Sequence, residues 1–405
     1  MARLLKLKTS DMIFNSKTSF LDFFMLTLLL FATMVTLSPA LNKIALYVVI
    51  PFLCLITFLR KTKILLTSKT LILHFLLVLW MGLTSLNAVY ADAARDGMVR
   101  LLSTFLLSVV IYSLARKSSS NIKWLYIIYM GNFISLMYYG YTVIGFEKVY
   151  LSGERLNDET LNANSLAYFL FYSSFGLFML TSWIKSKIYE KIALILVLIL
   201  TVVVSILTAS RQVVLIQIPL LIGYVTLRYI NFNAKNLFKM FVVIPVMVMV
   251  LLPVLLSIFK GSTLEKRMGA DIEEDSRFEL LVAATEVGLE NPVFGVGTSN
   301  FIFYNKRHEF SHSTYFELFA GNGVIALILF LAILIGSLKR QYNRYRFTRD
   351  NQFLFFLLFL LVFCLYNFFY VFINSLWLMP FYYIVECHSD AYFRAKYYCS
   401  DKINC

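Results

Sequence analysis

The sequence predicts an all-α integral membrane protein, and three of its properties lead to that class. Of its 405 residues, 60% are hydrophobic and only 15% are charged, a balance that would leave a water-soluble fold with far too much apolar surface. Apolar runs long enough to cross a bilayer, at about 20 residues per helix, recur along the chain. Most Lys and Arg lie in short segments between these runs, where they orient membrane helices. We therefore expect one polytopic membrane domain over residues 1–405.

The predicted membrane helices follow one another along nearly the whole chain. They cover about residues 20–37, 44–59, 71–86, 98–114, 124–146, 166–184, 192–208, 213–227 and 241–259, a tenth begins near Val324, and 353–385 holds two more with a turn near 367–374. The first run is long enough to span the membrane, so we expect no cleavable signal peptide.

Every second connection carries the basic residues, which places these connections in the cytoplasm by the positive-inside rule. The pattern predicts about twelve helices with both termini cytoplasmic. Polar segments at 87–96, 147–165, 209–212 and 260–322 then face outward. The last is a large periplasmic loop, and a loop of about 60 residues between helices is typically functional.

The net charge of +14 does not indicate nucleic-acid binding, because the basic residues flank apolar runs and meet anionic lipid head groups there. The five cysteines show no metal-ligand spacing and predict no disulfide framework. An outward DIEED run has two interpretations, a divalent-cation site or a plain acidic loop, and we expect the acidic loop. We expect no metal and no cofactor.

Two arginines at the outer face have both a structural and a functional interpretation. Arg211, in TASRQ between two apolar runs, is either an interfacial anchor with a snorkelling guanidinium or an anion ligand. Arg277 begins an amphipathic helix, capped near Asp275–Ser276, that ends by the Asn291–Pro292 step. A surface salt bridge with its acidic neighbours is the alternative to a functional role there.

Polar residues concentrate between Asn291 and Ala326, directly before an apolar run, and this indicates a site. His312 is its candidate general base, and Glu317, about one helical turn onward, is placed to hold the imidazole tautomer. The alternative is a capping or head-group-facing histidine. His308 lies in a solvated charge run, and His74 lies within an apolar helix as a core residue.

The glycines of NPVFGVG permit tight turns and close backbone approach. They do not form a dinucleotide fingerprint, because no strand precedes them within a βαβ unit. Arg95, Arg100 and Arg155 also face outward and are further candidates for phosphate or sugar contacts. For Arg100, an i,i+4 ion pair with Asp96 is the favoured structural alternative.

The order of these features resembles the bacterial O-antigen ligase and O-antigen polymerase superfamily. The resemblance covers about residues 156–335 and includes LNANSLAYF, the Ser-Arg step, the arginine-bearing loop, NPVFGVG and the His-Ser pair. In the ligase loop pattern, His312, Ser313 and Gly323 match, whereas Ala326 departs from the Gly/Thr/Tyr of the last position.

The resemblance implies a metal-independent inverting glycosyltransferase of the bacterial inner membrane, acting at its periplasmic face. Its donor would be an undecaprenyl-diphosphate-linked glycan, and its essential residues map to Arg211, Arg277 and His312. A ligase transfers finished O-antigen to lipid A-core, and we favour it on the His-Ser motif. A polymerase joins lipid-linked repeat units, and the R-x10-G spacing of Arg277 and Gly288 keeps it open.

Two other functional classes remain as alternatives. A transporter of lipid-linked oligosaccharide is the more distant one, because the chain shows neither internal repeats nor mid-membrane acidic residues. A structural scaffold would not require Arg and His focused on one face.

Overall fold

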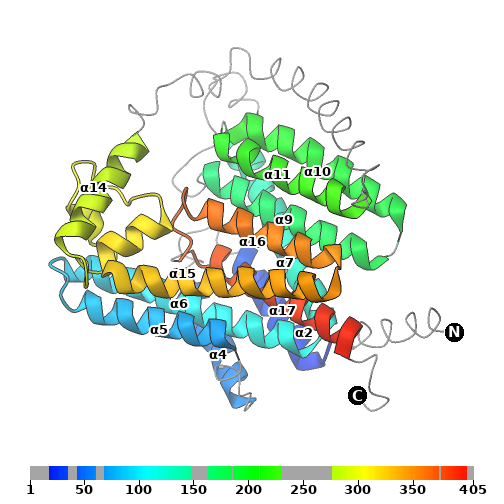
Figure 1. The fold of residues 1–405 in the computed structure, drawn as a ribbon, viewed down its shortest axis with the longest axis horizontal. Helices are drawn as coiled ribbons and strands as arrows, with labels where there is room; N and C mark the ends of the chain where they lie inside the picture. Colours follow the sequence, from blue (N-terminus) through cyan, green and yellow to red (C-terminus); the bar gives the residue numbers. More distant parts are fainter. Residues whose placement is uncertain are drawn as a thin grey trace.

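The computed structural model describes residues 18–34, 43–60, 68–146, 163–184, 186–208, 210–229, 276–373 and 375–398. Every regular element in these ranges is helical, as the sequence predicts. The long helices run side by side along one direction, and one shorter helix lies across one end of them (Figure 1).

The helices fall close to the predicted apolar runs. They are α2 (Phe20–Met34), α4 (Ile50–Leu59), α5 (Lys69–Ser85), α6 (Ala91–Lys117), α7 (Ser119–Tyr139), α9 (Ala163–Ile184), α10 (Lys187–Thr208), α11 (Arg211–Tyr229), α14 (Ser276–Glu290), α15 (Thr314–Thr348), α16 (Asn351–Tyr366) and α17 (Leu378–Phe393). Short π-helical turns precede α4 and follow α7 and α17, at Ala45–Val49, Gly140–Ile144 and Arg394–Tyr398, and a 3₁₀ turn covers Phe301–Phe303.

Five of the described helices are long and apolar enough to cross a membrane: Ala91–Lys117, Ser119–Ile144, Asn164–Ile184, Lys187–Thr208 and Thr314–Thr348. Several shorter apolar helices accompany them, α5 and α16 among them. The predicted span at 241–259 and residues 260–275 of the predicted 260–322 loop lie outside the described residues. The total of about twelve spans and the sidedness of the loop therefore stay predictions.

Two helix starts differ from the hydropathy-based prediction. α6 begins at Ala91 instead of near Met98, and α15 begins at Thr314 instead of near Val324. In both cases the helix continues beyond its apolar part, because hydropathy marks the stretch that suits hydrocarbon and not the hydrogen-bonded helix. In α15, a non-helical residue at Gly323 separates the polar first segment from the apolar second one.

α17 is the central helix of the bundle. All of its residues from Leu378 to Ser389 are buried, and a helix that is covered on every side lies in the interior. Its Phe381 ring packs among aromatic rings of α7, α9 and α16, with the ring centre of Tyr172 4.5 Å away. This aromatic core joins α17 to three of the helices that surround it.

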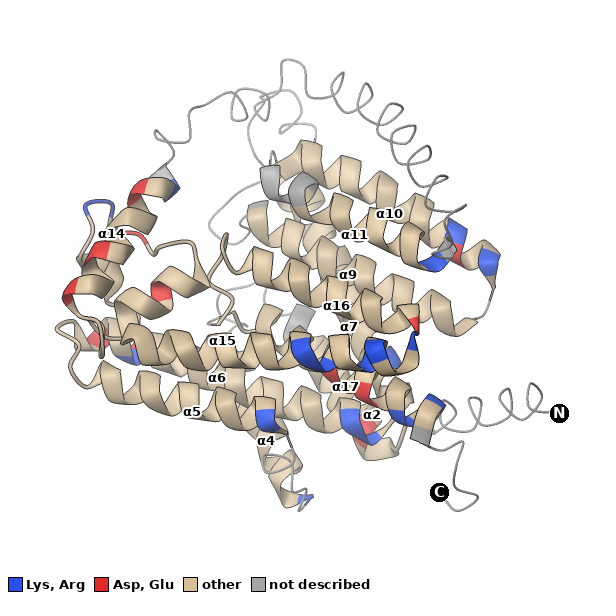
Figure 2. Ribbon diagram, in the orientation of Figure 1, with Lys and Arg blue, Asp and Glu red and all other residues tan. Residues whose placement is uncertain are grey.

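Charged residues are separated along the length of the bundle. Most Lys and Arg gather at one end, which we call the basic end, and several acidic residues lie on α14 at the other, the α14 end (Figure 2). The basic end includes Lys69, Lys117, Arg228, Arg340 and Arg344. Buried carboxylates there lie next to cations, as in the 2.9 Å contact of Lys117 Nζ with Asp22, which offsets part of their desolvation cost.

Candidate functional site

His312 lies in a tight turn whose two flanking serines are fully buried. Ser311 and Ser313 are 0% exposed. The hydroxyl of Ser311 donates to the carbonyl of Ser313 at 3.0 Å, and the hydroxyl of Ser313 donates to the carbonyl of Asn367 at 3.2 Å. His312 itself has φ 57°, a left-handed conformation that costs energy for a non-glycine residue and that clusters at functional sites. The serines therefore hold the turn, and the histidine projects from it.

The imidazole of His312 meets an aromatic ring on one side and a carboxylate on the other. Its ring centre lies 4.3 Å from that of Phe310, and its Nε2 lies 3.5 Å from Oε2 of Glu309. Its side chain is 22% exposed. A partly exposed imidazole near a carboxylate can take up a proton from a substrate hydroxyl, since the carboxylate favours the imidazolium.

Glu317 has a different role from the one expected. We predicted that it holds the imidazole of His312. Its buried carboxylate instead accepts a hydrogen bond from the backbone N–H of Ser311, with a distance of 2.8 Å. Glu309 is the carboxylate beside Nε2. Glu317 thus fixes the backbone of the turn, because the turn folds back over the first helical turn of α15, where Glu317 lies.

The start of α15 is also bound to the connection between α16 and α17. The backbone N–H of Thr314 donates to the carbonyl of Asn367 at 2.8 Å, and its hydroxyl donates to the carbonyl of Tyr370 at 2.9 Å. The same hydroxyl oxygen accepts from the N–H of Phe372 at 2.9 Å. The predicted turn near 367–374 therefore places Tyr370 beside the His312 turn.

The NPVFGVG segment packs backbone to backbone against the break in α15. The N–H of Gly297 donates to the carbonyl of Gly321 at 2.7 Å, and the N–H of Val324 donates to the carbonyl of Pro292 at 2.8 Å. A β-carbon on Gly323, where φ is 75°, would lie 2.0 Å from the carbonyl oxygen of Val293. The glycines thus serve close chain approach, as the sequence indicated.

A buried polar network joins this segment to α5. The side-chain amide of Asn322 donates to the hydroxyls of Thr84, at 2.6 Å, and Thr298, at 2.8 Å. The carbonyl of Asn322 accepts from the indole N–H of Trp80 at 2.9 Å. Asn300 bonds both backbone groups of Tyr90 just before α6. Segments that are far apart in sequence are therefore fixed at the α14 end.

A pocket of about 330 Å³ opens between these segments. Its walls come from α6, the 299–317 segment and the α16–α17 connection, and its lining residues include Asp96, Arg100, Phe310, Glu317 and Tyr370. The pocket thus lies directly beside the His312 turn, because Phe310 contacts both. Charged, hydroxyl and aromatic groups in one cavity are typical of a site for a polar ligand.

Arg100 supplies a cation to this pocket. Within the described part of the chain, its guanidinium makes no ion pair or hydrogen bond, so the predicted Asp96–Arg100 pair is wrong there. Asp96 lies instead 3.9 Å from Nε of Arg95, whose Nη2 is 3.2 Å from Asp92. Arg95 is exposed and does not line the pocket, which matches an ordinary surface ion pair. Arg155 lies outside the described residues.

The two arginines that the resemblance singles out begin helices. Arg211 is the first residue of α11, and Arg277 is the second residue of α14 and is half-buried. The hydroxyl of Ser210, directly before α11, donates to the side-chain oxygen of Asn164 at 3.2 Å. Asn164 is the second residue of α9, so the starts of α9 and α11 lie next to each other. The acidic neighbours expected for Arg277, at 273–275, lie outside the described residues. Helix N-termini favour anions, so both positions suit a phosphate contact.

α14 packs on the first segment of α15 through a small core of its own. Leu280, Ala284 and Val287 contact Val296, Phe301 and Ala320. A β-carbon on Gly288 would lie 2.4 Å from the ring of Phe319, so this glycine permits the close approach of the two helices. Arg307 Nε donates to Glu279 at 2.8 Å and holds the charged loop, including exposed His308, against α14.

Sequence reasoning did not identify Phe310, Glu309 or Tyr370 as parts of the site. Glu309 was assigned to the solvated charge run, although its i,i+3 spacing from His312 was a usable signal. Tyr370 reaches the site only through the α16–α17 connection. Its loss of contact with water raises the pKa of its hydroxyl, and the Arg100 guanidinium acts in the opposite direction. It is therefore a neutral hydrogen-bonding group in the pocket.

The fold and the site together define a polytopic α-helical membrane protein with a polar pocket and a histidine turn at one end of its bundle. Residues 194–331 match the family model described as O-antigen ligase, and this match confirms the resemblance to the O-antigen ligase superfamily. The matched segment contains Arg211, Arg277, His312 and Glu317. The match indicates a membrane enzyme of the O-antigen ligase or polymerase type. No curated protein matches the chain in the corresponding comparison.

Proposed function

We propose that this protein is a glycosyltransferase of the bacterial inner membrane that moves O-antigen, or a related polysaccharide, from undecaprenyl diphosphate to lipid A-core. The active site faces the periplasm, and both termini are cytoplasmic. The match over residues 194–331 supports the reaction type. The concentration of basic residues at the opposite end of the bundle supports the orientation (Figure 2).

The observation that carries the proposal is the construction of the His312 turn. Two buried serines and the Glu317 carboxylate hold a left-handed histidine next to a polar pocket. A capping or head-group-facing histidine would require no such support. Local strain that is maintained by several surrounding hydrogen bonds is characteristic of a positioned functional group.

In the proposed reaction, an acceptor hydroxyl attacks the anomeric carbon of the donor sugar. A new carbon–oxygen bond forms as the bond to the diphosphate oxygen breaks, which inverts the anomeric configuration. The hydroxyl proton passes to the imidazole of His312, and the bonding electron pair leaves with the lipid diphosphate. Glu309 stabilises the resulting imidazolium by its negative charge.

The departing diphosphate requires positive charge, and in a metal-independent reaction this charge comes from protein side chains. Arg211 and Arg277 supply it in this proposal, because a guanidinium fork binds phosphate oxygens with two parallel hydrogen bonds. Their places at the starts of α11 and α14 add the partial positive charge of the helix ends.

The pocket is suited to the acceptor sugar. Its volume of about 330 Å³ is near the lower limit for small-molecule sites, about 300–1,000 Å³, so it fits one or two sugar rings and not a polymer. Phe310 and Tyr370 offer aromatic faces for a sugar ring, and Arg100 and Asp96 offer partners for its hydroxyls. Because the pocket holds only one or two sugar rings, the rest of the donor glycan remains outside the helix bundle.

The second candidate is a polymerase that joins lipid-linked repeat units. Its R-x10-G signature fits Arg277 and Gly288, but the contact of Gly288 with Phe319 gives that glycine a packing role as well. The more distant alternative is a transporter of the same lipid-linked oligosaccharides. We favour the ligase, because a single small pocket beside one base suits a fixed acceptor.

Deleting the gene and separating the surface lipopolysaccharide on a gel distinguishes the ligase from the polymerase. Loss of a ligase leaves bare core, loss of a polymerase leaves core with a single repeat unit, and the wild-type gene restores the ladder in either case. Transfer from purified undecaprenyl-linked donor to lipid A-core, with a chelator present, tests the reaction itself. Purified protein that leaves the donor unconsumed while moving it across vesicles would favour the transporter.

A further inference from the structure

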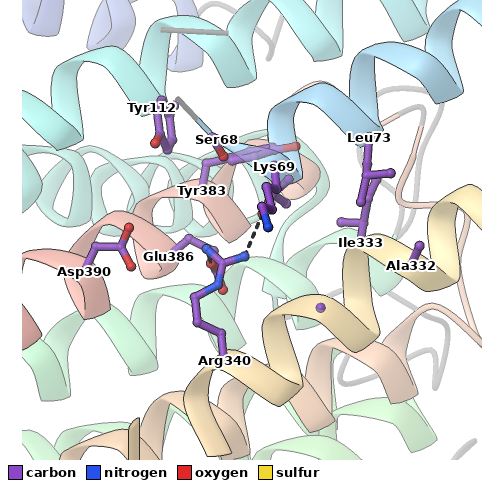
Figure 3. A pocket seen from close by; sticks show the side chains of 12 residues that line it. Ser68, Lys69, Leu73, Tyr112, Ala332, Ile333, Arg340, Tyr383, Glu386 and Asp390 are labelled. Atoms are coloured by element: carbon purple, nitrogen blue, oxygen red, sulfur yellow. Dashed lines mark hydrogen bonds and ion pairs between the residues drawn. The ribbon is translucent and has the colours of Figure 1, made fainter. Parts of the chain in front are cut away.

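A second pocket, of about 350 Å³, lies at the basic end of the bundle, far along the helices from the His312 turn. The start of α5, the later part of α15 and α17 form most of its walls, and Tyr112 of α6 completes it (Figure 3). Its lining combines Lys69, Arg340 and Glu386 with the apolar Leu73 and Ile333. The proposed transfer reaction uses none of these groups.

The cations of this pocket are unequally paired. Arg340 reaches from α15 toward α5, where its Nη2 donates to the hydroxyl of Thr70 at 2.9 Å, and its Nη1 lies 2.8 Å from Oε2 of Glu386. Asp390, also in the lining, is paired with Arg344. Lys69 makes no ion pair or hydrogen bond within the described ranges. The pocket therefore has one cation in excess.

The start of α5 adds further groups that attract an anion. Ser68 and Thr70 place hydroxyls beside Lys69, and Ser68 caps the helix by accepting from the N–H of Leu71 at 3.3 Å. The N-terminus of this 17-residue helix carries a partial positive charge. Together with the excess cation, it favours a phosphate group at this point.

The opposite wall contains a buried carboxylate that lacks hydrogen-bond donors. Glu386 is 3% exposed, its Oε2 lies 2.8 Å from Nη1 of Arg340 in an ion pair, and within the described residues neither of its oxygens has a hydrogen-bond donor in good geometry. A buried acceptor without a donor is costly. A ligand that brings an N–H or O–H to this wall would remove that cost.

The third wall is apolar and open toward the outside of the bundle. Leu73 of α5 faces Ala332 and Ile333 of α15 across the cavity. Gly336 belongs to this wall, and a β-carbon added there would meet no atom within 4 Å. Gly336 is exposed and both helices are apolar here, so a hydrocarbon chain can lie against this wall from outside the bundle.

We propose that this pocket binds the head group of a membrane phospholipid that carries a hydrogen-bond donor beyond its phosphate, such as phosphatidylethanolamine or phosphatidylglycerol. The phosphodiester contacts Lys69 and the start of α5, and the ammonium or hydroxyl group donates to Glu386. The acyl chains leave over Leu73 and Gly336. Phosphatidylcholine is excluded by its chemistry, because its quaternary ammonium has no N–H to donate.

The test uses the detergent-purified full-length protein and native mass spectrometry. We expect one retained copy of short-chain phosphatidylethanolamine or phosphatidylglycerol, with saturable binding, and binding of phosphatidylcholine at least about tenfold weaker, the equivalent of one lost charge-assisted hydrogen bond. Equal binding of phosphatidylcholine would overturn the proposed donor contact. Inorganic phosphate that competes at similar concentration would identify a phosphate site instead of a lipid site.

Variants of the pocket provide matched controls. Gly336→Phe fills the cavity from an open position and should abolish retention, whereas Ile335→Phe, at the exposed neighbouring residue outside the lining, should not. Lys69→Ala should weaken binding about tenfold, and Lys339→Ala, at the same end but outside the lining, should leave it unchanged. Lipid retention by Gly336→Phe equal to that of the wild type would refute the site.

Discussion

The carboxylate of Glu317 accepts a hydrogen bond from the backbone N–H of Ser311, 2.8 Å away, and closes the turn that carries His312. This hydrogen bond joins residues on either side of His312 and does not involve the imidazole ring. Ser311 and Glu317 therefore set the position of the histidine backbone, and the electrostatic partner of the ring is the neighbouring Glu309. The contact with the backbone of the turn and the contact with the imidazole therefore come from two different carboxylates.

Substitutions at Glu317 should separate these two roles. In Glu317→Gln, the amide oxygen can still accept from Ser311, so transfer should fall less than about tenfold, the equivalent of 1.4 kcal/mol. In Glu317→Ala, the buried N–H loses its acceptor, which should cost about 1–3 kcal/mol of stability and lower transfer. Thermal unfolding in detergent and transfer assays measure both. If Glu317→Gln were as inactive as His312→Ala but as stable as the wild type, Glu317 would take part in the chemistry directly.

Removing the proposed base should affect the rate much more than donor binding. His312→Ala should lower glycan transfer by about 10²–10⁴-fold, the usual contribution of a positioned base, while the protein still binds its lipid-linked donor. His308→Ala is the matched control, because His308 also has positive φ but lies exposed in the charged loop. Full transfer by His312→Ala would remove the base from the mechanism, and lost donor binding would make His312 a phosphate contact.

A lysine, which has the same charge, should not fully replace Arg211 or Arg277. Lysine offers a point charge without the planar fork, so Arg211→Lys and Arg277→Lys should each reduce transfer at normal expression. Arg95→Lys, at an exposed surface pair, should leave it unchanged. Normal activity of both site variants would favour lipid anchoring for Arg211 and a surface salt bridge for Arg277.

The break in α15 should tolerate no β-carbon. Gly323→Ala combines positive φ with a clash against the carbonyl of Val293 and should destabilise the protein by about 2 kcal/mol or more. Gly131→Ala, in the middle of α7, would place its β-carbon in ordinary contact with Leu30, and it should be neutral or stabilising. Unfolding midpoints in detergent test this difference. Equal midpoints for the two variants would mean that the NPVFGVG packing contributes little.

Reporter fusions test the orientation. A fusion after Ala270, within the long predicted loop, should report a periplasmic position, and one after Arg346, at the basic end of α15, a cytoplasmic one. The opposite result at either point would reverse the proposed sidedness of the active site.

Hydropathy and charge were sufficient to predict the described helices, because burial in hydrocarbon requires long apolar runs. They missed the polar starts of α6 and α15, where hydrogen bonds of side chains such as Thr314 add to the packing of a few apolar residues. The kink at Gly323 was equally hidden, since it lies where α15 packs against the backbone at Pro292 and Val293, a long-range arrangement that no local pattern encodes.

The site was predictable in its residues but not in its pairings. His312 and Arg100 were identified by residue type and position. The imidazole of His312 lies beside Glu309 because Glu317 instead accepts from the backbone N–H of Ser311, and Arg100 makes no ion pair with Asp96 within the described residues. For Arg100, the competing Arg95 lies nearer to Asp96. Tyr370 reaches the pocket through the tertiary fold alone.

The separate small core of α14 has a consequence for motion. Its core has six buried residues, far fewer than the main core, so we expect α14 to open locally at a lower free energy than the enclosed α17. Amide hydrogens of α14 should exchange with solvent sooner than those of the enclosed α17. In the proposed reaction, local opening of α14 would let a long glycan reach the histidine while the enclosed helices stay folded.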